Sequence, residues 1–194
     1  MIRHVVQAKK KIYQVWAEVL YRGSTPRKVY SWLEDGEDIA GEKDCAIVTG
    51  TASQQYVVPF DRFCKTYTTM EGTPLDSAVL YNMMCKEASR LGIPANKLNR
   101  VPGQPYLTSK DAPQVYAYRV PKDQTMQVRT SWGALLQVNA PGMEHGEGDW
   151  VLIAMKDDGT PDFKDQWVVN GLVFRDTYNT FPTDKPEYRE IDLP

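Results

Sequence analysis

The sequence predicts an α+β protein: two tandem, small, β-rich modules, each with a short C-terminal helix, joined by a longer helix and a Pro-rich linker. Three observations lead to this fold class. The chain of 194 residues repeats itself at an offset of about 100 residues, short apolar runs bounded by turn residues recur in both copies, and one amphipathic helical stretch lies between them. The expected boundaries are 1–72 for the first module, 73–112 for the helix and linker, and 113–194 for the second module with a C-terminal tail.

The internal repeat rests on matched residues in matched order. Residues 14–17 (Gln-Val-Trp-Ala) correspond to residues 114–117 (Gln-Val-Tyr-Ala), and the offset grows to 105 and then 111 after two insertions in the second copy. Over residues 13–69 there are 17 identities, where chance gives about three or four at average residue frequencies. Both insertions fall beside Gly, Pro and Asp, as loop insertions do. We therefore interpret the sequence as a tandem duplication.

Each copy shows the same expected series of strands followed by a short helix. The runs are rich in β-formers and are separated by Gly, Pro, Asp and Ser, which favour turns. In the first copy, aromatic residues at i, i+3 and i+7 within residues 60–67 predict a short helix. The expected strands are 13–21, 28–33, 45–48 and 55–58 in the first copy, and 114–120, 127–138, 150–155 and 166–169 in the second, which ends in a helix near 172–178.

The segment between the copies contains the best helix of the chain. Thr73 can cap it, Pro74 suits its first turn and Gly92 suits its end, so we expect a helix over 74–91. Its apolar stripe predicts burial of Val79, Met83 and Leu91, among others. Residues 93–113 are Pro-rich and are interpreted as an extended linker, and the polar tail 181–194 as loosely ordered or packed as an arm.

Charge and composition exclude several classes of protein. A net charge of −2 argues against a protein built to grip a nucleic-acid backbone, so nucleic acid is not expected as a partner. No run approaches the roughly 18–20 apolar residues of a membrane span, and the N-terminus lacks a signal-peptide pattern, so no membrane partner and a cytoplasmic location are expected. The basic cluster Lys9-Lys10-Lys11 is interpreted as a solvated arm, with a local nucleic-acid or partner contact as the alternative.

The repeated unit resembles a known family. Asp44-Cys45-Ala46-Ile47-Val48-Thr49-Gly50, then Tyr56-Val57-Val58 and Phe60-Asp61-Arg62-Phe63 with Tyr67, is similar to the PGDYG-motif domain, a small domain of bacteria and their phages. The second copy is similar through residues 148–153, 167–169, Phe174 and Tyr178. Both copies depart from the motif, since each lacks its Pro and Trp150 stands for the Tyr. The resemblance implies a fold and a phage-related context, and no activity.

The candidate chemistry is limited. The acidic residues Glu42 and Asp44 recur as Glu147 and Asp149 at matched turn positions, and His145 lies beside the second pair. Turn geometry explains a recurring Asp better than catalysis does, with a metal or general-acid role as the alternative. No nucleophile–base arrangement or nucleotide fingerprint occurs. We therefore expect no catalytic residue, no metal ligand and no cofactor.

The three cysteines fit neither a disulfide framework nor a zinc pattern. They are widely spaced and lie in apolar or mixed surroundings, at Cys45, Cys64 and Cys85. We interpret them as small buried thiols.

These observations favour a non-catalytic binding protein, such as an accessory or inhibitor protein of phage or mobile-element origin, that binds a macromolecular partner. The recurrence of the aromatic residues in both copies favours packing in the core, for Trp16 and its counterpart Tyr116 as for the others. As the alternative, these two rings are the possible anchors for a partner, because interface anchors are often Trp or Tyr. The acidic turns, with Glu42, Asp44, Glu147 and Asp149, are the other possible binding residues. The alternative function is a small-molecule-binding protein or enzyme with its site between the two repeats.

Overall fold

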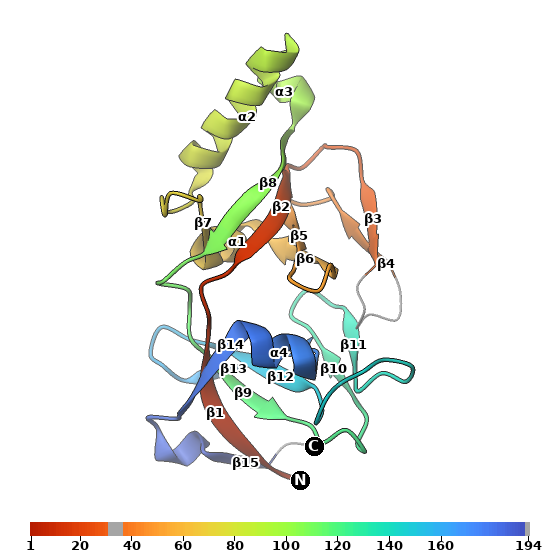
Figure 1. The fold of residues 1–194 in the computed structure, drawn as a ribbon, viewed down its shortest axis with the longest axis vertical. Coiled ribbons are helices and arrows are strands. Elements are labelled where there is room, and N and C mark those ends of the chain that lie inside the picture. Colours follow the sequence, from red (N-terminus) through yellow and green to blue (C-terminus); the bar gives the residue numbers. More distant parts are fainter. Residues whose placement is uncertain (31–36, 193–194) are drawn as a thin grey trace. The chain divides into compact units, whose positions relative to one another are not determined.

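The computed structural model describes residues 1–30 and 37–192 and shows a β-rich α+β protein (Figure 1). The described residues form two compact units. The first-copy unit comprises residues 12–30 and 37–112, and the second-copy unit comprises residues 1–11 and 113–192. None of the helices in the described ranges is both long enough and apolar enough to span a membrane.

The first-copy unit is built on a five-stranded sheet with the strand order β6-β5-β2-β8-β7. All of its neighbouring strands pair antiparallel. In β2, Val15, Ala17 and Val19 are buried on one face while Trp16 and Glu18 point to the other, as the alternation of a strand requires. The strands are β2 (Gln14–Leu20), β5 (Cys45–Thr49), β6 (Gln55–Pro59), β7 (Tyr67–Thr68) and β8 (Arg100–Thr108).

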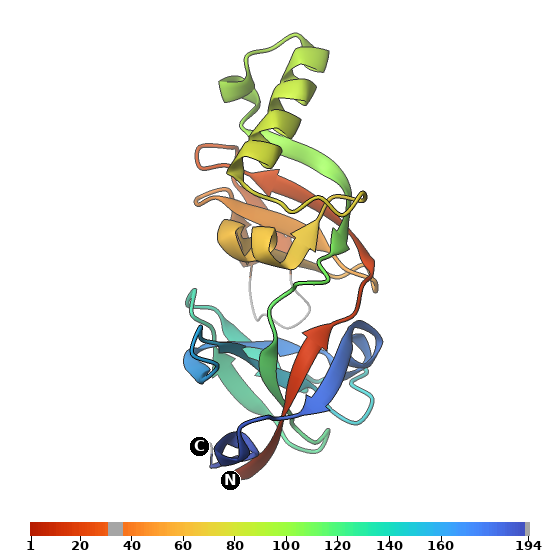
Figure 2. The same ribbon diagram turned by 90° about the vertical axis from the view of Figure 1, so that its left-hand side faces the viewer.

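Helices cover the face of Val15, Ala17 and Val19. The main core of the unit joins these residues to Phe63 and to Leu80. Figure 2 shows the longest helix lying over β8. The helices are α1 (Phe60–Thr66), α2 (Ser77–Leu91) and α3 (Ala95–Leu98).

A hairpin of β3 (Arg27–Tyr30) and β4 (Glu37–Ala40) belongs to the opposite face. Val29 of β3 packs with Leu20, Cys45 and Ile47 in a small separate cluster. The expected strand 28–33 overlaps β3, and its residues 31–33 lie outside the described residues. The hairpin therefore covers only one part of this sheet face.

The second-copy unit is built on a sheet with the strand order β13-β12-β9-β1-β14, and β15 also pairs with β1. The face with Ala8, Val115 and Ala117 packs against Phe174 of its helix. The other face buries Tyr116 and Tyr118 with the hairpin residues Val128 and Leu136. The elements are β1 (Ile2–Lys10), β9 (Val115–Arg119), β10 (Met126–Arg129), β11 (Leu135–Val138), β12 (Trp150–Met155), β13 (Pro161–Val169), α4 (Gly171–Thr177), β14 (Tyr178–Pro182), η1 (Pro186–Tyr188) and β15 (Glu190–Asp192).

The connecting helix is shifted relative to the prediction. It begins after Asp76, whose carboxylate accepts a hydrogen bond from the backbone N–H of Val79 at 2.8 Å, and not at the predicted cap Thr73. It ends at Gly92, as predicted, with a left-handed φ of 68°. Its buried residues are Leu80, Met84 and Ala88, whereas Val79 and Met83 are half-buried and Leu91 is exposed.

The expected extended linker 93–113 is wrong, because it contains α3 and the nine-residue strand β8. Pro102 and Pro105 suggested a linker because Pro removes a hydrogen-bond donor from a strand. In the sheet, β7 pairs only with Leu107 and Thr108, so both prolines lie where β8 has a strand neighbour on one side alone. The prolines are tolerated for that reason.

The N-terminal basic cluster differs from expectation. Lys9 and Lys10 belong to β1, not to a solvated arm, and Lys10 lies over the ring of Tyr178 at 5.6 Å from its centroid. Of the two interpretations of the tail, packing as an arm is confirmed through residue 192, since β14 and β15 both pair with β1. The division into 1–72, 73–112 and 113–194 therefore differs from the observed units. Residues 1–11 pair with the second-copy unit through β1, and residues 73–112 join the first-copy unit through β8.

Candidate functional site

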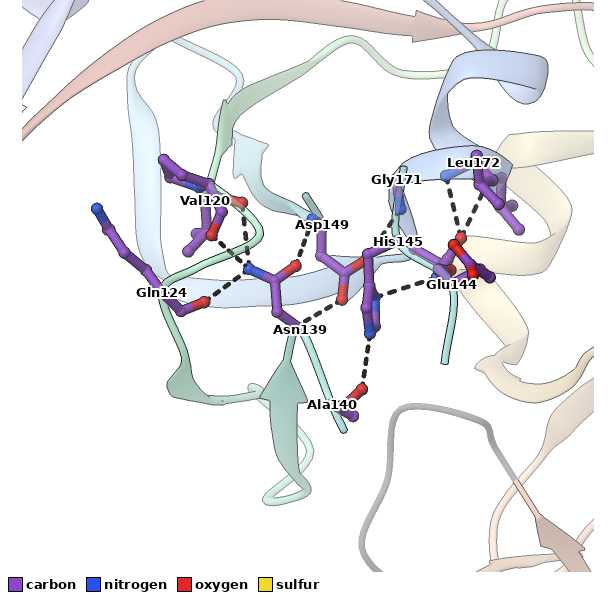
Figure 3. A network of polar contacts seen from close by, with 12 residues as sticks. Val120, Gln124, Asn139, Ala140, Glu144, His145, Asp149, Gly171 and Leu172 are labelled. Carbon is purple, nitrogen blue, oxygen red and sulfur yellow. Dashed lines mark hydrogen bonds and ion pairs between the residues drawn. The ribbon is translucent and has the colours of Figure 1, made fainter. Parts of the chain in front are cut away.

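Asp149 is the centre of a buried polar network in the second-copy unit (Figure 3). Its side chain is fully buried. Its Oδ2 accepts a hydrogen bond from the backbone N–H of Asn139 at 2.8 Å, and its Oδ1 accepts one from Gly171 at 3.0 Å. The Asn139 side chain returns a bond by accepting from the Asp149 backbone N–H at 2.8 Å, and it donates to the backbone carbonyls of Val120, Pro121 and Gln124. The carboxylate thus ties the end of β11 to the start of α4.

His145 completes the network with both of its ring nitrogens. Nδ1 lies 2.7 Å from Asp149 Oδ1, and Nε2 lies 2.7 Å from the backbone oxygen of Ala140. Asn170 Nδ2 also lies 3.3 Å from Nδ1. The two closest partners of the ring nitrogens are oxygen acceptors, and this arrangement favours a hydrogen on both nitrogens, the imidazolium form. Burial lowers the pKa of His145, but the hydrogen bonds to Ala140 and Asp149 and the nearby charges of Asp149 and Glu144 raise it to a net value above the ordinary one.

Two glycines let the loop before β12 pack closely, Gly148 against the backbone that follows β9 and Gly171 between this loop and the start of α4. Gly148 has a φ of 126°, and a Cβ there would overlap the backbone oxygen of Val120. A Cβ on Gly171 would overlap the backbone oxygen of His145. Asn170 caps the helix by accepting from the backbone N–H of Leu172 at 3.0 Å. The network is therefore a structural clamp between the loop and the helix.

This arrangement leaves His145 unsuited to general-base chemistry. A general base needs a nitrogen lone pair within reach of a substrate proton, and both ring nitrogens are occupied by groups of the protein. Its partner Asp149 is fully buried and accepts three hydrogen bonds from the protein. Within residues 1–30 and 37–192, no three His, Cys, Asp or Glu side chains are grouped so that they could hold a metal ion.

The other acidic turn residues do not join this network. Glu147 is exposed and forms an ion pair with Arg119. Glu42 and Asp44 are exposed in the first-copy unit, where Asp44 Oδ1 accepts a hydrogen bond from the backbone N–H of Arg22 at 2.6 Å. Asp44 therefore links the loop before β5 to the turn after β2, which is a structural contact between two loops.

The two candidate aromatic anchors have different surroundings. Tyr116 is fully buried, and its hydroxyl donates to the backbone oxygen of Gly159 at 2.7 Å, so its ring is part of the core. Trp16 is 52% exposed. Its indole lies against Gly103 of β8, where a Cβ would come within 2.5 Å of the indole nitrogen. A side chain at position 103 would displace the indole.

A surface groove of about 160 Å³ surrounds Trp16, and we call it the Trp16 groove. It lies on the sheet face that the β3–β4 hairpin covers only in part, and all of its lining belongs to the first-copy unit. Gln55 donates to the Thr49 hydroxyl at 3.2 Å beside the indole. The groove is lined by Trp16, Glu18, Arg27, Lys28, Val29, Ile47, Thr49, Gln55 and Gly103.

Charged side chains gather on one carboxylate in the groove. Glu18 accepts from Arg27 in a two-bond ion pair and from Arg100 Nη1 at 3.0 Å. Its side chain is only 13% exposed, whereas the side chains of Arg27 and Arg100 are 43% and 41% exposed. The carboxylate is therefore shielded from solvent while the guanidinium groups remain accessible. Two guanidinium groups therefore bind this one carboxylate, and Lys28 adds a third cation to the residues on this side of the sheet.

Sequence reasoning missed the cationic side of this groove. Arg27, Lys28 and Arg100 come from β3 and β8, and β8 was interpreted as a linker. The pairing register between β2 and β8 shifts between Ala17 and Val19, at the position of Glu18. Such irregularities redirect a side chain, and no pattern in the sequence indicated this one.

The chain matches no protein-family model, no curated protein and no solved structure. The resemblance to the PGDYG-motif domain therefore stays a prediction.

Proposed function

We propose that this chain is a non-catalytic binding protein that holds a segment of a protein partner in the Trp16 groove. The observation that carries this proposal is the indole of Trp16, which is half-exposed and lines the groove on this sheet face. Large aromatic residues beside a pocket are typical interface anchors. The occupied nitrogens of His145 support the non-catalytic part of the proposal.

The size of the groove favours a macromolecular partner over a free small molecule. Sites for drug-sized ligands enclose roughly 300–1,000 Å³, and the groove has about 160 Å³. That volume suits one inserted side chain, with the remaining partner segment lying across the surface around it.

The charges favour an acidic partner segment. The exposed faces of Arg27 and Arg100 can each bind a further carboxylate, because a guanidinium has five N–H donors in a planar fork. Beside them the indole offers an apolar face. The segment that fits best therefore carries an aromatic or aliphatic side chain next to Asp or Glu.

We also propose that the two units are divergent copies of one module. The matched residues of the two copies and the equal order of corresponding strands support this. Two modules of PGDYG-like ancestry, in a phage or mobile-element protein, would agree with a binding role in the cytoplasm.

A random peptide library selected on the full chain tests the groove. We expect the selected peptides to contain an aromatic or aliphatic residue next to Asp or Glu. Trp16→Ala should weaken their binding at least tenfold, and added salt should weaken it as well. Trp132→Ala is the matched control, since Trp132 is a 38% exposed indole in the other unit, and it should leave binding unchanged.

Two outcomes would overturn the proposal. One is peptide binding that is equally strong in the Trp16→Ala variant. The other is turnover of a small substrate by the purified protein that is lost in the folded Asp149→Ala variant.

A further inference from the structure

Each sheet takes one strand from the other sequence repeat. In the second-copy unit, β1 lies between β9 and β14, although β1 precedes the first repeat (Figure 1). In the first-copy unit, β8 lies between β2 and β7, although β8 directly precedes the second repeat. The two strands occupy corresponding positions, because β9 corresponds to β2 and β14 corresponds to β7 in the internal repeat.

The pairing registers make this correspondence exact to the residue. Ala8 pairs with Val115 and Tyr106 pairs with Val15, where Val15 and Val115 are matched repeat positions. On the other side, Lys10 pairs with Tyr178 and Thr108 pairs with Tyr67, again matched positions. In both comparisons, residue i of β1 has the same pairing position in its sheet as residue i+98 of β8 has in the other sheet.

The hydrogen bonds that follow the two strands obey the same rule. The backbone N–H of Lys11 donates to the Thr177 carbonyl at 2.8 Å, and that of Ser109 donates to the Thr66 carbonyl at 2.8 Å. Lys11 and Ser109 are 98 residues apart, and Thr66 and Thr177 are matched repeat positions. Ala8 and Tyr106 are both fully buried. The strands share register and core position, although no matched position carries the same residue in 6–10 and 104–108.

We propose that the chain is a strand-exchanged pair of modules fused into one polypeptide, in which each module binds the first strand of its sister. This rests on the proposal that the units are two copies of one module, and it is independent of the Trp16 groove. In each module the first strand is β1 or β8, and the next is β2 or β9. Each sheet then binds a strand donated by the other repeat between its second and last strands.

The residues between β1 and β2 explain why β1 does not fold back on its own repeat. Lys11, Ile12 and Tyr13 separate the two strands, and a three-residue hairpin loop needs a residue in the left-handed region. Gly, Asn and Asp adopt that region readily, whereas Ile is β-branched and stiff. An extended connection suits these residues better, and it carries β1 out of its own repeat into the other sheet.

Disulfide trapping in the full chain tests the exchange. Lys9 and Asn179 are paired across β1 and β14, so cysteines at these positions lie within the Cα separation that a disulfide spans. Lys9→Cys with Asn179→Cys should form an intrachain disulfide in the monomer, identified by mass spectrometry of the linked peptides.

The matched control places the second cysteine in the other sheet. Thr68 corresponds to Asn179, and it would face Lys9 if β1 stayed in its own repeat. Lys9→Cys with Thr68→Cys should therefore give no intrachain disulfide. A 9–68 disulfide would overturn the exchange and leave the two-copy proposal and the groove intact. A 9–179 disulfide only between chains, or no disulfide in either variant, would overturn the exchange as well.

A cut between Glu71 and Gly72 gives a second readout without cysteines. Both residues are exposed in the turn after β7, so a protease site inserted there is accessible. The cut gives the fragments 1–71 and 72–194. Because strand exchange places strands of both fragments in each sheet, the fragments should stay together until denaturant unfolds them. Two folded fragments that separate in native buffer would contradict it.

Discussion

Trp16 of β2 and Tyr116 of β9 occupy matched positions in two sheets of equal strand order, and they differ in what covers them. Over Tyr116 the β10–β11 hairpin residues, Tyr188 and Ile191 complete a large core. On the corresponding face of the first-copy unit, the β3–β4 hairpin covers only a small cluster around Leu20 and Ile47, and Trp16 stays half-exposed. The same strand position therefore becomes core or half-exposed surface according to which segments pack on it.

The loop before the third strand shows a second difference. Asp149 is clamped by His145, Asn139 and Gly171, whereas its counterpart Asp44 is exposed. At the positions of Gly148 and Gly171 the first repeat has Lys43 and Phe60. The close backbone contacts that these glycines permit, with residues 120–122 and between the loop and α4, are impossible with those side chains. A recurring Asp thus became a buried structural residue in one unit alone.

The largest expected effect comes from Ala8→Asp in β1. Ala8 is fully buried against Val115, Leu152 and Phe174, so the variant buries an unpaired charge and should cost more than about 4 kcal/mol. Amide exchange should lose protection in β9 and β12 and keep it in β2 and β5. If protection from amide exchange were lost in β2 and β5 instead, β1 would be shown to stabilise the sheet of the first-copy unit. Lys9→Ser, at a half-buried neighbour, is the control.

Asp149→Ala should have the next largest effect. It removes the acceptor of two backbone N–H groups and of the His145 cation, and breaking such a buried pair costs about 3–5 kcal/mol. The exposed counterpart Asp44→Ala should cost about 1 kcal/mol or less. Urea denaturation, with amide exchange as the probe of each unit, measures the free energy of unfolding of both variants. If the two variants lost equal stability, the distinction between the two loops would be wrong.

Tyr116→Ala should mainly lower the stability of its unit, whereas Trp16→Ala should mainly weaken peptide binding. Tyr116→Ala should destabilise its unit by about 3–5 kcal/mol, because it empties a fully buried ring site. Trp16→Ala should change the thermal midpoint little and remove peptide binding. Calorimetry and peptide titration of both variants would contradict the comparison if Trp16→Ala were the more destabilising.

The smallest expected effect is a pH dependence confined to the second-copy unit. The pKa of His145 is raised in the folded protein, so its stabilising contribution is complete below the unfolded value of about 6.5 and is lost as the pH rises through the folded value. Calorimetry between pH 6 and pH 9 should show the midpoint of this unit falling. His145→Gln should flatten that slope, and a slope unchanged in the variant would assign the effect to another group.

The sequence by itself determined the β-rich α+β class, the strands predicted at 45–48 and 150–155 and the end of α2 at Gly92, because alternation, apolar runs and helix caps are local signals. The repeat pattern matched Trp16 with Tyr116 and did not indicate that Trp16 is the exposed ring of the two. Only the tertiary structure placed β1 and β8, since the choice between equivalent sheet partners depends on long-range pairing. It also decided which matched residue is covered, because burial depends on segments distant in the chain: η1 and β15 over Tyr116, and none of these over Trp16.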